Sequence, residues 1–260
     1  MTHPMTQLQD QCRSLRLAET AKELPTLLRK AESHQWTYHE FIYELFLYEQ
    51  KCREEKQLSK LLKWAKFPAP LTLDEFNLAE QRTISQKQFK QLRELLWIEQ
   101  QFNIILLGPP GAGKTHIAIG LGMEAVQKGY QVMFMAMGEL VHLLKTKEFS
   151  RKSQVLYKRM IQSDLVIIDD MMYMAMDTKE ANLFFHLINE LYDRSSIIIT
   201  SNKGPDEWGE LLGDQGITTA ILDRLLHRVQ VLNMEDEDSF RMKHRKTIFT
   251  ENENPEDSMK

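Results

Sequence analysis

The chain has 260 residues, 42% of them hydrophobic and 27% charged, and a formal net charge of −4, so it can bury a hydrophobic core in one large domain or two small ones. Its apolar runs are too short to span a bilayer and no signal sequence begins it, so we expect a soluble, cytoplasmic protein without a membrane partner. Its two cysteines, Cys12 and Cys52, fit no metal or redox spacing.

The first part of the chain is predicted to be helical, with no strand signal over residues 8–66. Thr37 and Glu40 have the spacing of a capping box, so a long helix should begin there. Its apolar residues recur every three or four positions with cations between them, which predicts one packed face and one basic face. Pro68 and Pro70 close this segment. We therefore predict a small all-α domain over residues 1–68 and a linker over residues 69–84.

Strands and helices alternate in the rest of the chain, after a second capping box that begins at Ser85. Strands are predicted at residues 103–107, 131–135, 165–168, 196–199 and 228–232. Apolar strands separated by helices are typical of a mostly parallel sheet covered on both faces. We expect an α/β domain over residues 85–249, with a five-stranded sheet flanked by helices, and a flexible acidic tail over residues 250–260.

A glycine-rich turn links the first of these strands to the next helix. The sequence GPPGAGKT at residues 108–115 fits G-x-x-x-x-G-K-[ST], in which glycines let backbone N–H groups close around phosphate oxygens. Lys114 should reach the β- and γ-phosphates, and Thr115 should offer its hydroxyl to Mg²⁺. A helix predicted over residues 114–128 directs its positive end at the same phosphates. The candidate ATP-binding residues are Gly108, Pro109, Pro110, Gly111, Ala112, Gly113, Lys114, Thr115 and His116.

Two later strands end in polar side chains suited to ATP hydrolysis. Asp169 should hold Mg²⁺, and Asp170 should orient or deprotonate the attacking water. Asn202 could hold that water or touch the γ-phosphate, although a simple Ser-Asn turn is the more ordinary explanation. Arg224 and Arg228 lie one helical turn apart, which suits an arginine donated to a neighbouring subunit's γ-phosphate, but surface arginines are also common.

The motifs GPPGAGKT, LVIIDD, IITSN and ILDRLLHR, in this order and spacing, resemble the AAA+ ATPases of the initiator and helicase-loader group. Within that group the chain most resembles the IstB-like ATP-binding proteins of insertion sequences, with the helicase loaders DnaC and DnaI as neighbours. The segment from Tyr48 to Pro68, followed by residues 72–76, extends the resemblance into the helical part and favours the transposition branch.

The resemblance implies roles for residues that the spacing alone left open. Asn202 would be the γ-phosphate sensor and Arg224 the arginine finger, with Arg228 as the alternate. Many AAA+ proteins carry glutamate where Asp170 stands, so slow hydrolysis would be unsurprising. The chain is too short for a full C-terminal lid, and Arg241 is the only stand-in for the lid's sensor arginine.

Two groups of cations become candidates for contacts with DNA phosphates through the same resemblance, whereas the ordinary explanation for each is a solvated charged face. They are Lys51, Arg53, Lys56, Lys60 and Lys63 in the helical part, and Lys145, Lys147, Arg151, Lys152, Lys158 and Arg159 between the second and third strands.

These expectations favour an ATP-dependent homo-oligomer, with ATP at its subunit interfaces, that binds duplex target DNA and recruits or stimulates a transposase. ATP and Mg²⁺ would be its cofactors. A replicative helicase loader is the main alternative. A DNA-binding module that holds ATP passively and a small-molecule kinase with the same phosphate loop are further ones.

Overall fold

The computed structural model describes residues 4–78, 83–171 and 175–234. The chain divides into two compact units, Met1–Lys63 and Trp64–Lys260. No helix among the described residues is long and apolar enough to cross a membrane. The predicted acidic tail and Arg241 both lie outside the described residues.

The first unit is helical, as predicted. It consists of α1 (Pro4–Ser14), α2 (Ala18–His34) and most of α3 (Tyr38–Ala65). The capping box at the start of α3 is confirmed: the Thr37 N–H donates to the Glu40 carboxylate at 2.7 Å, and the Glu40 N–H donates to Thr37 Oγ1 at 3.3 Å. The expected packed face of α3 is only partly covered in this unit. Its exposed apolar side chains are Tyr38, Ile42, Tyr43, Phe46 and Leu47.

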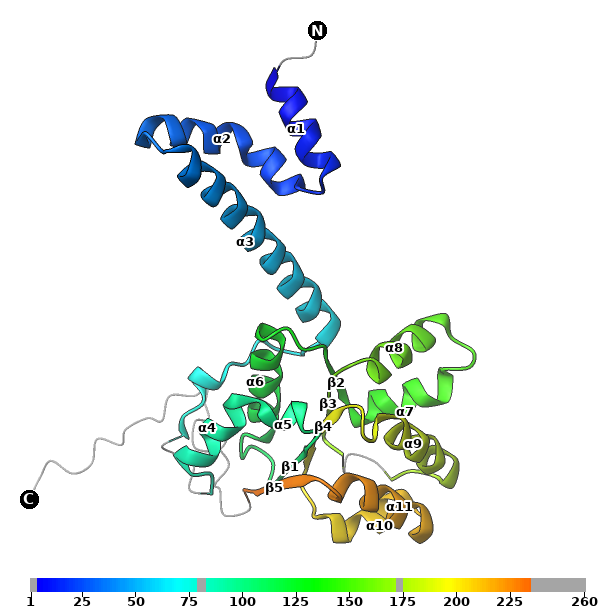
Figure 1. The fold of residues 1–260 in the computed structure, drawn as a ribbon. Coiled ribbons are helices and arrows are strands. Elements are labelled where there is room, and N and C mark those ends of the chain that lie inside the picture. Colours follow the sequence, from blue (N-terminus) through cyan, green and yellow to red (C-terminus); the bar gives the residue numbers. More distant parts are fainter. Residues whose placement is uncertain (1–3, 79–82, 172–174, 235–260) are drawn as a thin grey trace, which may run out of the picture. The chain divides into compact units, whose positions relative to one another are not determined.

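The second unit is built on a parallel sheet of five strands in the order β2-β3-β4-β1-β5 (Figure 1). The strands are β1 (Asn103–Leu107), β2 (Val132–Ala136), β3 (Leu165–Asp169), β4 (Ser196–Ser201) and β5 (Val229–Asn233). The predicted strands are confirmed, with small shifts at their ends. Because the inner strands are covered on both faces, they read as continuous apolar runs, which explains why the sequence revealed them.

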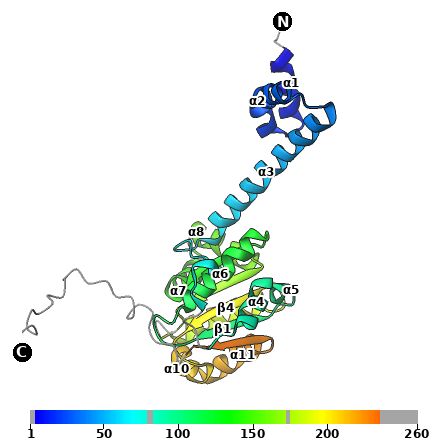
Figure 2. The same cartoon turned by 90° about the vertical axis from the view of Figure 1, so that its left-hand side faces the viewer.

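Helices cover both faces of this sheet (Figure 1). One side carries α4 (Gln86–Glu94), α5 (Leu96–Glu99) and α6 (Lys114–Gln127), and the other carries α7 (Met137–Thr146), α8 (Arg151–Ile161), α9 (Thr178–Leu191), α10 (Trp208–Leu212) and α11 (Gln215–Leu226). Short 3₁₀ turns lie at η1 (Leu73–Glu75) and η3 (Pro205–Glu207). Figure 2 shows β1 and β4 behind α4 and α6, with α10 and α11 at the edge that β5 forms.

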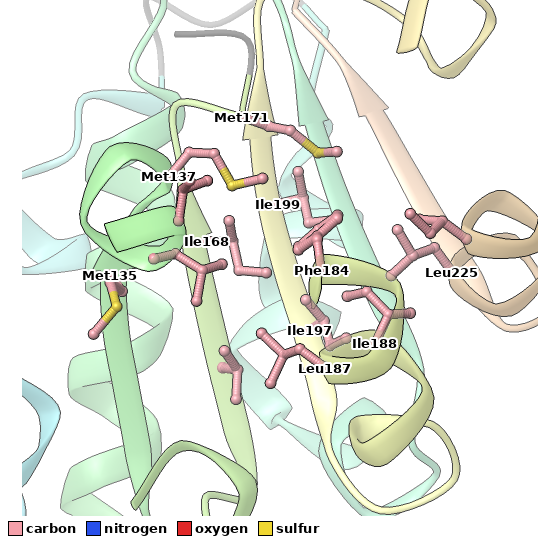
Figure 3. Close-up of a cluster of buried hydrophobic side chains, with 14 of the residues drawn as sticks. Met135, Met137, Ile168, Met171, Phe184, Leu187, Ile188, Ile197, Ile199 and Leu225 are labelled. Atoms are coloured by element: carbon pink, nitrogen blue, oxygen red, sulfur yellow. The ribbon is translucent and has the colours of Figure 1, made fainter. Parts of the chain in front are cut away.

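A large cluster of buried hydrophobic side chains lies between the sheet and α7, α9 and α11. In Figure 3, Phe184, Leu187 and Ile188 of α9 pack on Ile197 and Ile199 of β4. Since side chains alternate along a strand, the other set of β4 residues, which includes Ile198 and Thr200, faces α6 instead. This alternation decides which polar side chains meet at the end of the sheet.

The segment 67–76, most of which was predicted to be linker, packs on α6. A Cβ on Gly120 would come within 2.4 Å of Leu73 Cδ2, and one on Gly122 within 2.9 Å of the Phe67 ring. Phe67 also lies edge-on to Phe134 of β2, with ring centroids 6.4 Å apart. The two glycines therefore leave room on α6 for this segment.

Candidate functional site

The glycine-rich loop lies between the carboxyl end of β1 and the start of α6. Gly108, Gly111 and Gly113 have φ angles of +150°, +88° and +94°, which side chains with a Cβ rarely adopt. A Cβ on Gly108 would also stand 2.8 Å from the backbone oxygen of Met234. The Ile117 N–H begins the α6 ladder by bonding Gly113 O at 3.0 Å, so Lys114, Thr115 and His116 form the positive end of that helix.

Lys114 is buried, and its Nζ donates to the carbonyls of Gly108 and Pro109 at 2.7 and 2.9 Å. The ammonium group thus lies over the loop that the motif assigns to phosphate. His116 differs, because its ring is used inside the protein. Its Nε2 bonds Thr72 O at 2.8 Å, and the ring packs edge-on against Phe76. The side chain of His116 is therefore occupied by contacts within the protein, and a nucleotide contact would have to come from its backbone N–H in the first turn of α6.

Asp169 meets α6 because it faces the same side of the sheet as Ile167, two residues earlier on β3. Thr115 Oγ1 donates to Asp169 Oδ1 at 2.9 Å. These two oxygens are the hard ligands that Mg²⁺ prefers. Thr200 also contributes, since its Oγ1 donates to Asp169 Oδ1 at 2.7 Å and accepts from the Asp170 N–H at 2.8 Å.

Thr200 is a site residue that sequence reasoning missed. Its signal was present, because it follows Ile198 with the two-residue period of a strand and so faces Thr115 and Asp169. Asp170, the predicted water-activating carboxylate, is exposed and has a φ of +60°. Asn202, the predicted sensor, is exposed directly after β4. Parallel strands end at a common edge, so these residues all lie at the edge that carries the loop.

Arg224 lies at the other end of the strands, near the amino end of β1. The carbonyl of the next residue, Leu225, accepts from the Asn103 side chain at 2.9 Å, and Asn103 is the first residue of β1. One strand length therefore separates Arg224 from the glycine loop of its own chain. Arg228 is beyond the end of α11 in a turn, so the two arginines do not share a helix as predicted. Its Nη1 donates to Gln100 O at 3.4 Å.

The candidate DNA-binding cations fall into two sets. Some are engaged within the chain: Lys145 with Glu180, Lys147 over the Tyr157 ring, Arg159 over the Trp64 ring, Arg53 with Glu49, and Lys56 with Glu19. The hydrogen bond that Lys145 donates to Glu180 raises the pKa of Lys145. The others are exposed and have no ion pair with a described residue: Lys51, Lys60, Lys63, Arg151, Lys152 and Lys158.

The residues present fit a magnesium-bound nucleotide. Three glycines hold backbone angles and a close approach that a Cβ would disturb, a buried lysine lies over their carbonyls, and a threonine and a carboxylate offer oxygen ligands 2.9 Å apart. Among the described residues, no cluster of His, Cys, Asp and Glu suggests a second kind of metal site.

Comparisons with known proteins agree with ATP binding by this chain. Residues 10–248 match the model of the family described as IstB-like ATP binding protein. The chain is 38% identical over 244 residues to an insertion sequence IS21-like ATP-binding protein of Bacteroides fragilis, a match that covers 94% of this chain and 92% of the relative. It is 33% identical over 239 residues to an insertion sequence IS5376 ATP-binding protein of Geobacillus stearothermophilus, covering 92% and 95%.

Two solved structures share the fold. AMPPCP-bound DnaA from Aquifex aeolicus has a TM-score of 0.53 at 22% identity, over 65% of this chain and 51% of DnaA. The DnaC helicase loader has a TM-score of 0.51 at 19% identity, over 64% of this chain and 97% of that protein. These likenesses confirm the predicted AAA+ arrangement of the sheet and its helices.

Proposed function

This chain belongs to the family of IstB-like ATP-binding proteins, and on that premise we propose that it is an AAA+ ATPase that assists DNA transposition. Copies of the chain assemble on duplex target DNA with ATP between neighbouring subunits. The assembly recruits or stimulates a transposase, and ATP hydrolysis controls how long it persists. Support comes from the names of the relatives, which are ATP-binding proteins of insertion sequences.

The site residues take the following roles in this proposal. Lys114 binds the β- and γ-phosphates, and Thr115 and Asp169 hold Mg²⁺, which neutralises charge on the phosphates when bound. Asp170 orients the attacking water and accepts its proton. Asn202 contacts the γ-phosphate. Thr200 positions both carboxylates through its two hydrogen bonds.

One observation carries the oligomeric part of the proposal. Lys114 lies near the carboxyl end of β1, and Arg224 lies near the amino end of the same strand. An arginine a strand length from its own glycine loop cannot stabilise the phosphate that this loop holds. It can act on the nucleotide of a second copy whose loop edge faces it, where a guanidinium would stabilise charge in the transition state. ATP then becomes a bridge between subunits.

The test is sedimentation of the purified protein with fluorescent duplex or single-stranded DNA, each with ATP or ADP. We expect large ATP-dependent assemblies on duplex DNA that are lost in Lys114→Ala and Arg224→Ala but kept in Lys90→Ala, a control at an exposed lysine of α4. Assembly by Lys114→Ala equal to that of the wild type would overturn the proposal. A preference for single strands without such assemblies would favour a helicase loader.

Hydrolysis needs its own test. Asp170→Asn should keep ATP binding and lose turnover, measured as phosphate release, because it removes the carboxylate that accepts the proton. Unchanged turnover in this variant would contradict the role of Asp170. If neither this variant nor the wild type released phosphate, the protein would be a passive ATP-binding module.

A further inference from the structure

Arg224 is held by two residues of α9 that no role above includes. Phe185 and Asn189 are four positions apart, so both lie on the side of α9 that faces α11. The Arg224 guanidinium carbon lies 4.9 Å from the centroid of the Phe185 ring, and Nε donates to Asn189 Oδ1 at 3.0 Å. Nη1 also donates to Ala220 O of its own helix at 2.8 Å.

We propose that Phe185 and Asn189 are positioning residues that hold Arg224 ready for the γ-phosphate bound by a neighbouring subunit. This inference rests on the trans role of Arg224 proposed above. The aromatic face sets the plane of the guanidinium, and the hydrogen bond to the Asn189 oxygen sets its orientation within that plane. The side chain therefore loses its conformational freedom when the chain folds, before the subunits meet.

The contacts leave Arg224 able to bind an anion. A guanidinium has five N–H donors, and the hydrogen bonds to Asn189 and Ala220 use one on Nε and one on Nη1. The Nη2 group has no hydrogen bond to a described residue. None of the three contacts is with a carboxylate, so no residue that the structure describes forms an ion pair with Arg224.

The same contacts distinguish Arg224 from Arg228. Arg228 is exposed in the turn after α11, and the one hydrogen bond that its side chain makes with a described residue is the 3.4 Å contact with Gln100 O. An unrestrained arginine must be ordered when the phosphate binds, which weakens its effect on the transition state. The platform of Phe185 and Asn189 therefore selects Arg224 as the arginine that acts in trans.

Mixed oligomers test the platform separately from the trans arginine. Asp170→Asn subunits have an inactive site and an intact Arg224, whereas Arg224→Ala subunits have an intact site and no arginine. Mixing them should restore ATPase activity at the interfaces where the first kind faces the second. Adding Phe185→Leu or Asn189→Ala to the Asp170→Asn subunits should lower the restored kcat about three- to tenfold, with little change in KM.

Two controls exclude general damage. Asn182→Ala, added to the same Asp170→Asn subunits, removes an exposed asparagine of α9 whose side chain donates to Thr178 O of its own helix, and it should leave the restored kcat unchanged. Phe185→Tyr keeps the aromatic face and should behave as the wild type. A Phe185→Leu subunit with an intact site should also reach normal kcat when Asp170→Asn subunits supply the arginine. The substitution affects only the Arg224 that this subunit offers to its neighbour, and leaves its own ATP site intact.

The outcomes separate the two proposals. If Asp170→Asn and Arg224→Ala subunits do not restore activity together, Arg224 does not act in trans, and the positioning role of Phe185 and Asn189 is rejected as well. If activity is restored equally by donors with and without Phe185→Leu and Asn189→Ala, the platform alone is wrong.

Discussion

Thr200 links Asp169, the last residue of β3, with Asp170, which follows it. Its side chain is buried, and its hydroxyl bonds both Asp169 Oδ1 and the Asp170 N–H. Valine has the same shape but no hydroxyl, so Thr200→Val leaves the Asp170 N–H without its acceptor, at a cost of about 1–3 kcal/mol. We expect ATPase kcat to fall about tenfold while ATP affinity changes little, since a displaced carboxylate affects the transition state more than phosphate binding.

Thr218 provides the matched control for that substitution. It is also buried, and its hydroxyl donates to the backbone oxygen of Asp214, the N-cap of its own helix, at 2.6 Å. Thr218→Val should lower the free energy of unfolding by a similar amount without changing kcat. Equal kcat values for Thr200→Val and the wild type, measured with saturating ATP, would contradict the positioning role of Thr200.

At the scale of the elements, α6 carries two glycines that helix propensity alone disfavours. Gly120→Ala should destabilise the protein by about 1–3 kcal/mol, because the new methyl group would overlap Leu73, including its backbone nitrogen at 3.2 Å. Gly138 of α7 is the control, since a Cβ there meets no atom within 4 Å. Gly138→Ala should stabilise the protein by about 0.5–1 kcal/mol. Urea unfolding measures the free energy of unfolding of both variants. A stabilising Gly120→Ala would show that segment 67–76 can move to accommodate the methyl group.

The start of α2 depends on Glu49, a buried carboxylate of α3. It accepts from the Thr20 N–H at 3.0 Å and from Thr20 Oγ1 at 2.7 Å, and Arg53 Nε donates to it at 2.9 Å. Burial alone would raise the pKa of Glu49, but these hydrogen bonds outweigh it and hold the pKa below its ordinary value of 4.5. The folded state therefore binds this proton less readily than the unfolded state does.

The sign of that shift gives a pH prediction. The stabilisation from Glu49 is complete above about pH 5 and is lost as the pH falls from 4.5 through the lowered folded value. Glu49→Gln should cost about 1–3 kcal/mol at pH 7 and progressively less toward pH 3, measured by urea unfolding followed through helical circular dichroism. Glu55→Gln, at an exposed position of α3, is the control for the loss of one carboxylate from the same helix. A constant cost from pH 7 to pH 3 would rule out the carboxylate as the cause.

Elements whose signal is local could be predicted from the sequence, and contacts between distant segments could not. An apolar run predicts strand β1, and a motif of fixed spacing predicts the glycine loop. By contrast, Glu49 caps a helix 29 residues earlier, and Leu73 fits against Gly120. No periodicity encodes such pairs, because they exist only after the segments pack. The platform under Arg224 belongs to the same class, since Phe185 and Asn189 read as ordinary positions of an amphipathic helix.

For the molecule as a whole, a net charge of −4 means that any DNA contact must come from local cations. Lys152 and Lys158 of α8 are exposed and have no ion pair with a described residue, whereas Lys145 of α7 and Arg159 of α8 are engaged within the chain. The first pair is therefore better placed to displace counterions from DNA phosphates, a contribution that grows when many subunits bind one duplex.

Replacing Lys152 and Lys158 with glutamine should weaken ATP-dependent binding to duplex DNA for all base sequences alike. The slope of log K against log salt should become shallower by about 1.8 per subunit if both lysines contact phosphate, since each contact contributes about 0.9. Lys87→Gln with Lys90→Gln removes the same charge from exposed positions of α4 and serves as the control. If the two double variants lost affinity equally, the effect would come from net charge and α8 would not contact the DNA. A change in slope confined to the α8 variant would instead assign this helix to the DNA-facing side of the assembly.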